Sequence, residues 1–140
     1  MKYCNEMSLK FLSLSENESF ARLAVASFCS NLSLTVEDIT DIKTAISEAV
    51  TNCVVHAYDR GVGEITINCK TNKEKIHIEV IDSGIGIENI SEATRPFYTS
   101  KPESERSGIG FTVMEGFMDE MIVESAKDKG TKVTLIKNII

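Results

Sequence analysis

Three short segments, in a fixed order along the chain, combine polar groups or glycines with a strong secondary-structure signal. The first is a helical run at residues 48–58, the second follows a strand at 82–87, and the third is a glycine pair opening a helix at 107–111. Each segment alone also fits an ordinary helix edge or turn. Together they restrict the chain to folds in which a helix, a strand end and a helix N-terminus surround one pocket.

Glu48, Asn52 and His56 recur every four residues, so in a helix they form one polar ridge. The ridge borders the apolar stripe of this helix, and we expect it to be partly buried. A buried polar group without a partner costs roughly 1–3 kcal/mol, and a bound ligand could supply the partner. The amide oxygen of Asn52 suits magnesium, and Glu48 could act as a general base. The alternative is a solvated helix edge with incidental spacing.

The sequence Asp82-Ser-Gly84-Ile-Gly86 closes a strand with a carboxylate and two glycines. A carboxylate at this place can accept a hydrogen bond from the exocyclic amine of adenine. Glycines let the backbone pass close to a base and adopt positive φ. Thr131, at the start of the last expected strand, could join Asp82 beneath the base. The alternative at both places is a plain turn.

The run from Ser107 to Gly110 precedes a helix, whose free N–H groups and dipole make a ready anion site. The motifs of competing nucleotide folds are missing, since the chain has no GxxxxGK[ST] loop and no GxGxxG run after the first strand. No Ser/His/Asp nucleophile set and no Cys/His metal cluster is visible. His77 alternates within a strand, so we expect a structural role for it. The three segments together predict a pocket for a nucleotide and a divalent metal.

Composition narrows the class of protein further. The chain of 140 residues is 42% hydrophobic and 26% charged, as expected for one globular domain spanning residues 1–140. A net charge of −6 argues against nonspecific nucleic-acid binding, which needs a basic face. The four cysteines lack CxxC spacing, and no apolar run is long enough to cross a membrane. We therefore expect a cytoplasmic protein with free, mostly buried thiols, no membrane association and no direct contact with nucleic acid.

Periodicity and turn signals predict an α+β fold, a two-layer sandwich whose mixed, mostly antiparallel sheet is covered on one face by helices. A capping box at Ser15 is expected to start the first helix, and a second start signal at Thr35, with acidic residues in the first turn, is expected to start the next one. The long stretch between residues 83 and 107 has no sustained period, which is typical of a functional loop. The expected strands are 7–14, 64–69, 75–81, 119–125 and 131–136, and the expected helices are 16–29, 36–57 and 108–117.

The three segments resemble the N, G1 and G2 boxes of the ATPase superfamily that contains gyrase, the heat-shock ninety chaperones, histidine kinases and mismatch-repair ATPases. The resemblance implies the Bergerat ATP-binding fold, ATP or ADP with Mg²⁺ as cofactors, and an ATP lid at about residues 87–107. It places Asn52 on magnesium, Asp82 on adenine and the second glycine box on the phosphates. The nucleotide-binding positions it implies are Asn52, His56, Ala57, Asp82, Gly84, Gly86, Ile87, Thr99, Lys101, Ser107, Gly108, Ile109, Gly110, Phe111 and Thr131.

A closer resemblance, to the anti-sigma-F serine kinases of endospore-forming bacteria, covers nearly the whole chain. It is carried by residues 15–22, 47–52, 99–103, 105–108 and 117–120, which extend well beyond the superfamily boxes. Two departures are Ala57, where glycine is common, and a short turn at 59–63. Neither touches a group with a chemical role.

This family resemblance implies a homodimer that holds a sporulation sigma factor (sigma F) inactive while ATP is bound. It also implies phosphorylation of a serine on an anti-anti-sigma antagonist, and capture of the unphosphorylated antagonist by the ADP form. Glu48 would be the base for the substrate serine, Arg106 would reach the γ-phosphate, and Arg22 would dock a partner. Without this resemblance, the sequence indicates only that Arg22 is an arginine on the surface of a helix.

Three alternatives stay open at this point. The first is a sister kinase that controls the general stress sigma factor, with the same chemistry and another partner. The second is a nucleotide-gated binding module that releases its partner without phosphoryl transfer. A histidine-kinase catalytic domain is less favoured, because the sequence has no phosphoacceptor helical hairpin.

Overall fold

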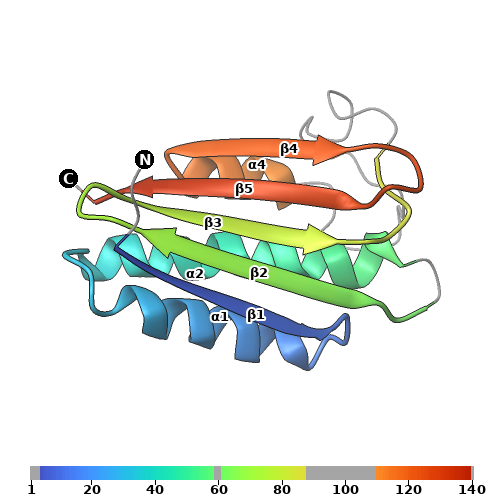
Figure 1. Cartoon of the computed structure of the whole chain (residues 1–140), viewed down its shortest axis with the longest axis horizontal. Helices are drawn as coiled ribbons and strands as arrows, with labels where there is room; N and C mark the ends of the chain where they lie inside the picture. The colour runs from blue at the N-terminus through green and yellow to red at the C-terminus, as the bar shows by residue number, and fades with distance from the viewer. Residues whose placement is uncertain (1–3, 59–60, 88–109, 140) are drawn as a thin grey trace.

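The computed structural model describes residues 4–58, 61–87 and 110–139. Its sheet has five strands in the order β1-β2-β3-β5-β4, and all four pairings between neighbours are antiparallel. The last strand in sequence therefore lies inside the sheet, between β3 and β4 (Figure 1). The strands are β1 (Asn5–Leu12), β2 (Glu64–Thr71), β3 (Lys75–Asp82), β4 (Glu120–Ser125) and β5 (Thr131–Asn138).

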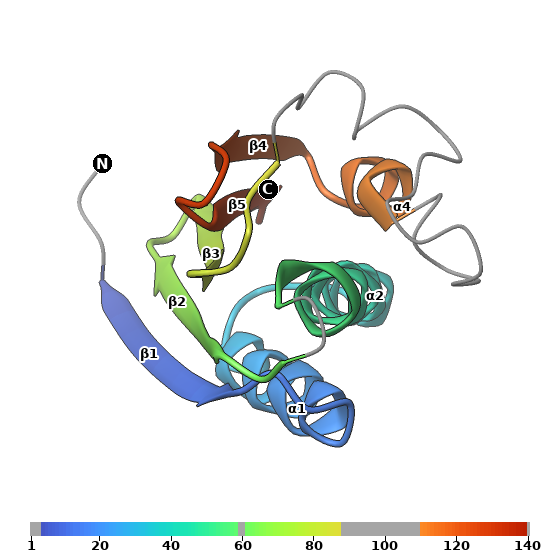
Figure 2. The same ribbon diagram turned by 90° about the vertical axis from the view of Figure 1, so that its right-hand side faces the viewer.

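The helices all cover one face of this sheet, as the end-on view in Figure 2 shows. They are α1 (Asn17–Cys29), α2 (Val36–Asn52), the π-helical turn η1 (Cys53–Ala57) that continues α2, and α4 (Gly110–Phe117). This arrangement confirms the expected α+β sandwich. Within the described ranges, no helix combines the length and the apolar character needed to span a membrane.

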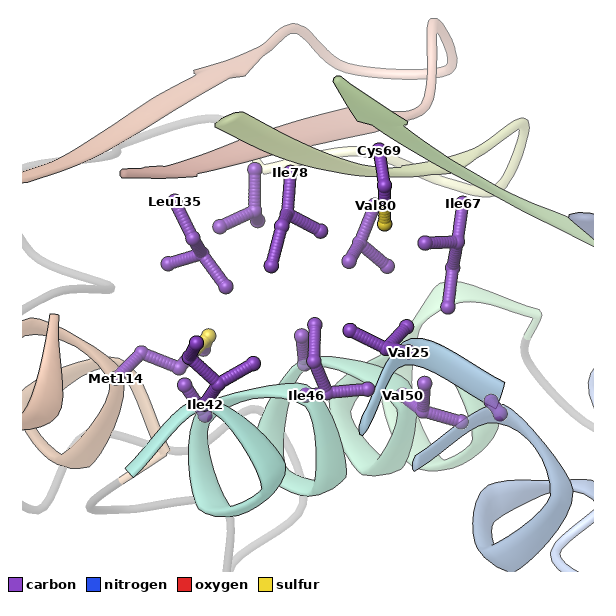
Figure 3. Close-up of a cluster of buried hydrophobic side chains, with 14 of the residues drawn as sticks. Val25, Ile42, Ile46, Val50, Ile67, Cys69, Ile78, Val80, Met114 and Leu135 are labelled. Carbon is purple, nitrogen blue, oxygen red and sulfur yellow. The ribbon is translucent and has the colours of Figure 1, made fainter. Parts of the chain in front are cut away.

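The core fills the space between the sheet and the helices (Figure 3). Residues alternate along β2 and β3, so every second side chain points towards the helices and is buried. Each helix packs one apolar face against the sheet, since residues three and four apart lie on the same side of a helix. The side chains that meet here, labelled in Figure 3, include Val25, Ile42, Ile46, Val50, Ile67, Cys69, Ile78, Val80, Met114 and Leu135.

The two expected helix starts have different outcomes. The helix start at Thr35 is confirmed, and the structure adds a capping box there: the Thr35 hydroxyl accepts from the Asp38 N–H at 3.0 Å, and the Asp38 carboxylate accepts from the Thr35 N–H at 3.2 Å. The box at Ser15 is wrong: α1 begins two residues later, its N-cap is Glu16, and no side chain caps it. The Asn17 amide instead donates back to the Leu12 carbonyl at 2.9 Å, which fixes the turn out of β1.

Candidate functional site

The polar ridge lies at the C-terminal end of α2. Glu48 is 5% exposed, and Asn52, one turn later, is half-buried. The expected helix 36–57 is helical throughout, but its last turn is π-helical, with i→i+5 bonding, from Cys53 to Ala57. A π turn holds more residues than an α turn, so the step from Asn52 to His56 rotates less about the helix axis than the step from Glu48 to Asn52. Single π turns are frequent at functional sites.

The π turn is locked against the loop after β3. The Ile85 N–H donates to the Ala57 carbonyl at 2.8 Å, and a Cβ on Gly84 would collide with the backbone of Ala57. Gly86 has a φ of 74°, and a Cβ there would meet the Ala126 carbonyl oxygen. Both glycines of the predicted loop are therefore required by close backbone contacts.

Asp82 is the last residue of β3 and is 8% exposed. Its Oδ1 accepts from the Gly84 N–H at 2.9 Å, its Oδ2 accepts from the Cys53 thiol at 3.5 Å, and the backbone N–H of Thr131 also bonds to the carboxylate. Burial raises the pKa of Asp82, while these three hydrogen bonds lower it; burial prevails. Burial also raises the pKa of Cys53 well above its ordinary value, so the thiol keeps the proton that it donates.

Thr131 lies opposite Asp82 in the register of β3 and β5, so the expected proximity of the two residues is confirmed. The Thr131 and Ser125 hydroxyls lie 2.8 Å apart across the β4–β5 hairpin. Ser125 Oγ also donates to the Gly130 carbonyl and accepts from the Ile87 N–H, each at 2.8 Å. One serine thereby holds the end of the loop after β3 against the last hairpin.

Sequence reasoning missed three residues that build this region: Cys53, Tyr58 and Ser125. Tyr58 donates from its hydroxyl to the Glu64 carbonyl at 2.6 Å and accepts from the Ser83 N–H at 2.7 Å. The position of Ser125 could have been found by pairing the two last expected strands across their turn, which sets Ser125 opposite Thr131. Nothing in the sequence indicated a site role for Cys53, because a thiol on the apolar stripe of a helix is typical of a core residue.

The remaining predicted positions divide into two groups. Phe111 is half-buried against the core, and Gly110 is the first residue of α4. On α1, Arg22 donates to Glu18 Oε2 at 2.9 Å and borders a pocket of about 350 Å³ between α1 and α2. The other group lies outside the described residues: Thr99, Lys101, Arg106, Ser107, Gly108 and Ile109.

The described residues fit a nucleotide with a hard cation. Asn52 lies one turn after Glu48, whose carboxylate is buried. The amide oxygen of Asn52 is a ligand type that magnesium accepts. No group of three His, Cys, Asp or Glu side chains is close enough to hold a metal among residues 4–58, 61–87 and 110–139.

Comparison with known proteins agrees with this geometry. Residues 11–137 match the family model of the histidine kinase-like ATPase domain. A protein of Caldanaerobacter subterraneus subsp. tengcongensis is 56% identical over 139 residues, covering 99% of this chain and 97% of its own length. A protein of Clostridium acetobutylicum is 57% identical over 133 residues, covering 95% and 93%. Both are named Anti-sigma F factor.

Solved structures show the same fold at low identity. The RsbU and RsbW domains of Rv1364c from Mycobacterium tuberculosis match with a TM-score of 0.66 and 20% identity, over 95% of this chain and 31% of that one. The catalytic domain of the histidine kinase ThkA matches with a TM-score of 0.60 and 17% identity, over 94% and 95%.

Fold and site together define an ATP-binding domain of the histidine kinase-like class. At more than 50% identity over nearly the full length, the chain belongs, within that class, to the family of the proteins named Anti-sigma F factor.

Proposed function

We propose that this protein is an ATP-dependent serine kinase that also inhibits a sporulation sigma factor, sigma F. The observation that carries the proposal is the 53–57% identity, over nearly the whole chain, to proteins named Anti-sigma F factor. The proposal includes one ATPase domain, residues 1–140, with an ATP lid at about residues 87–107.

The adenine would bind at the end of β3. There the Asp82 carboxylate, oriented by Gly84 and Cys53, would accept a hydrogen bond from the exocyclic amine, with Thr131 beside it. The phosphates would bind at the N-terminus of α4, where the glycines of the second box, Gly108 and Gly110, would leave backbone N–H groups available. The remaining nucleotide positions proposed are His56, Ala57, Gly86, Ile87, Thr99, Lys101, Ser107, Ile109 and Phe111.

Phosphoryl transfer would use two further side chains. Glu48 would take the proton of the substrate serine as its oxygen attacks the γ-phosphorus, while the bond to the β–γ bridging oxygen breaks and ADP leaves. Arg106 would stabilise the charge on the γ-phosphoryl oxygens. Magnesium at Asn52 supplies further charge neutralisation when it is bound.

The nucleotide would select the partner. The ATP form, as a homodimer, would hold the sigma factor, and the ADP form would bind the unphosphorylated antagonist, with Arg22 at a docking surface. The charge of Arg106 beside the γ-phosphate would distinguish the two states.

Glu48→Gln tests the catalytic assignment. We expect loss of phosphoserine on the antagonist in an assay with radiolabelled ATP, with ATP affinity within about twofold of the wild type. Transfer at the normal rate would remove Glu48 from catalysis. If the wild type itself transfers nothing, the protein is a nucleotide-gated binding module, and co-purification from the host would show whether its partner is sigma F or the stress sigma factor.

Asn52→Ala tests the metal assignment. We expect magnesium-dependent ATP affinity to fall at least tenfold in a calorimetric titration, because the variant removes the one protein ligand proposed for the ion. Asn68→Ala is the matched control, since Asn68 bonds to Ser8 and Glu79 on the opposite face of the sheet. Equal magnesium dependence in both variants would contradict the assignment.

A further inference from the structure

One largely buried lysine ties the C-terminal end of α4 to two other elements. Lys137, on the helix-facing side of β5, donates from Nζ to the Phe117 carbonyl at 2.8 Å. The same Nζ forms an ion pair with Asp41 Oδ2 of α2 at 3.3 Å. The two side chains are only 11% and 20% exposed, respectively. An ammonium group also complements the negative end of the dipole of α4.

Neighbouring hydrogen bonds strengthen this attachment. Directly after α4, the Asp119 N–H donates to the Ile136 carbonyl at 2.9 Å. The Asp119 carboxylate accepts from the Asn138 N–H at 2.6 Å. The strand positions on either side of Lys137 thus hold the chain that leaves α4. The end of this helix is fixed in position by backbone and side-chain bonds together.

The helices α2 and α4 are antiparallel, and the ion pair of Lys137 with Asp41 lies at the end of this helix pair that is remote from the proposed nucleotide site. Asp41 is in the second turn of α2 and Phe117 is the last residue of α4, so Asn52 and Gly110 lie towards the other end of the helix pair (Figure 1). At about 1.5 Å per residue, Asn52 is about 16 Å from Asp41 along α2, and Gly110 is about 10 Å from Phe117 along α4. Lys137 therefore joins the two helices that would hold the metal and the phosphates.

Packing alone would hold α4 less firmly. Its fully buried contact with α2 is made by Met114, which lies near Ile42 in Figure 3. Methionine is unbranched and adapts to irregular gaps, so this contact tolerates small shifts of α4 against α2. A directional ion pair and a hydrogen bond to the helix end resist sliding. A helix of eight residues moves almost as one body, so a shift at Phe117 reaches Gly110.

We propose that Lys137 is a positioning residue for the phosphate-binding end of the nucleotide site, acting through α4. The inference rests on the proposed function, because it takes the N-terminus of α4 as the phosphate site. The adenine end is built on β3 and β5 around Asp82 and does not depend on where α4 lies. Loss of Lys137 therefore weakens the binding of the phosphates and spares the binding of the base.

The test compares Mg-ATP with adenosine. For Lys137→Met we expect a dissociation constant for Mg-ATP about tenfold higher by calorimetry, and one for adenosine, followed by NMR, within about twofold of the wild type. Lys137→Arg keeps the charge and should bind Mg-ATP within about threefold of the wild type. Lys132→Met is the matched control, because this β5 lysine pairs with Glu79 at 3.1 Å on the other face of the sheet; it should change neither constant.

Two outcomes would overturn the inference: unchanged Mg-ATP binding by Lys137→Met, or equal weakening of Mg-ATP and adenosine. If circular dichroism shows that Lys137→Met is unfolded, Asp41→Asn decides, with about threefold weaker Mg-ATP binding expected and adenosine unchanged. A wild-type protein that binds no Mg-ATP would refute the proposed function itself. That result differs from tight wild-type binding that Lys137→Met retains, which refutes only the role of Lys137.

Discussion

Asp82 lowers the stability of the free protein and also belongs to the proposed nucleotide site. Its carboxylate is 8% exposed and accepts bonds from Gly84, Cys53 and Thr131. Because burial outweighs these bonds, the pKa of Asp82 is raised, and the ionised folded state is disfavoured relative to the protonated one. A site that holds a charge ready for a ligand is expected to reduce the stability of the free protein in this way.

The first prediction concerns pH. A raised folded pKa means that the folded state binds the proton more tightly, so stability falls as pH rises above the ordinary value of 3.8 and levels off above the raised pKa. The free energy of unfolding of the wild type minus that of Asp82→Asn should follow this course in urea titrations from pH 4 to 8 without nucleotide. A difference that rises with pH would contradict the assignment.

Glu79→Gln serves as the control with the opposite sign. Burial raises the pKa of Glu79, but Lys132, Asn68 and His77 together lower it more, so the net shift is downward. Its stabilisation is present above the ordinary value of 4.5 and is lost as pH falls towards the lowered pKa. The corresponding difference should rise slightly from pH 4 and be flat above about pH 6.

The second prediction compares two glycines. Gly130 has a φ of 79°, and a Cβ there would collide with the Asp82 backbone, so Gly130→Ala should destabilise the protein by about 1–3 kcal/mol. Gly116, in α4, has open space around a Cβ, so Gly116→Ala should stabilise it by up to about 1 kcal/mol. Denaturant unfolding measures both. Equal effects of the two methyl groups would show that the close contact at Gly130 does not matter.

At the scale of elements, periodicity predicted every described helix and strand with ends within about two residues, because the alternation along β2 and β3 and the stripe of α2 reflect burial on one side. Two local features could not be predicted. The helix begins at Asn17, whose side chain bonds back to the Leu12 carbonyl, and not directly after Ser15. The π turn ends where Ala57 meets Ile85, a contact that no local pattern encodes.

The third prediction compares the cap found at Thr35 with the one expected at Ser15. Thr35→Ala removes an acceptor for the Asp38 N–H and should cost about 1 kcal/mol in urea unfolding. Ser15→Ala removes no side-chain cap and should stay within about 0.5 kcal/mol of the wild type. A larger loss at Ser15 than at Thr35 would mean that α1 begins where the sequence pattern predicted.

At the scale of the whole molecule, hairpin signals predicted which strands pair in sequence, but the insertion of β5 between β3 and β4 is set by long-range packing. That insertion is what brings Thr131 opposite Asp82. The approach of the two residues was predicted from their chemistry, whereas Ser125 and Cys53 enter the site only through the folded register. Their roles therefore required the three-dimensional arrangement.

The fourth prediction links the site to global stability. Mg-ATP at a hundred times its dissociation constant should raise the free energy of unfolding by about 2.7 kcal/mol, because only the folded state binds it. Chelation of magnesium should remove most of this gain, as measured by thermal unfolding. In Asn52→Ala the chelator should make little further difference. A full gain that survives chelation would contradict a metal-bridged phosphate site.

The unequal burial of the thiols has a practical consequence. Cys4 is exposed beside the first pair of the sheet, whereas Cys29, Cys53 and Cys69 are buried. Burial raises the pKa of Cys29 to about 12 and also raises that of Cys69, so neither offers a thiolate at neutral pH. A maleimide dye should attach to the unmodified protein at Cys4 alone. The native chain thereby provides a fluorescence anchor at the edge of the sheet, with no cysteine to remove by mutagenesis.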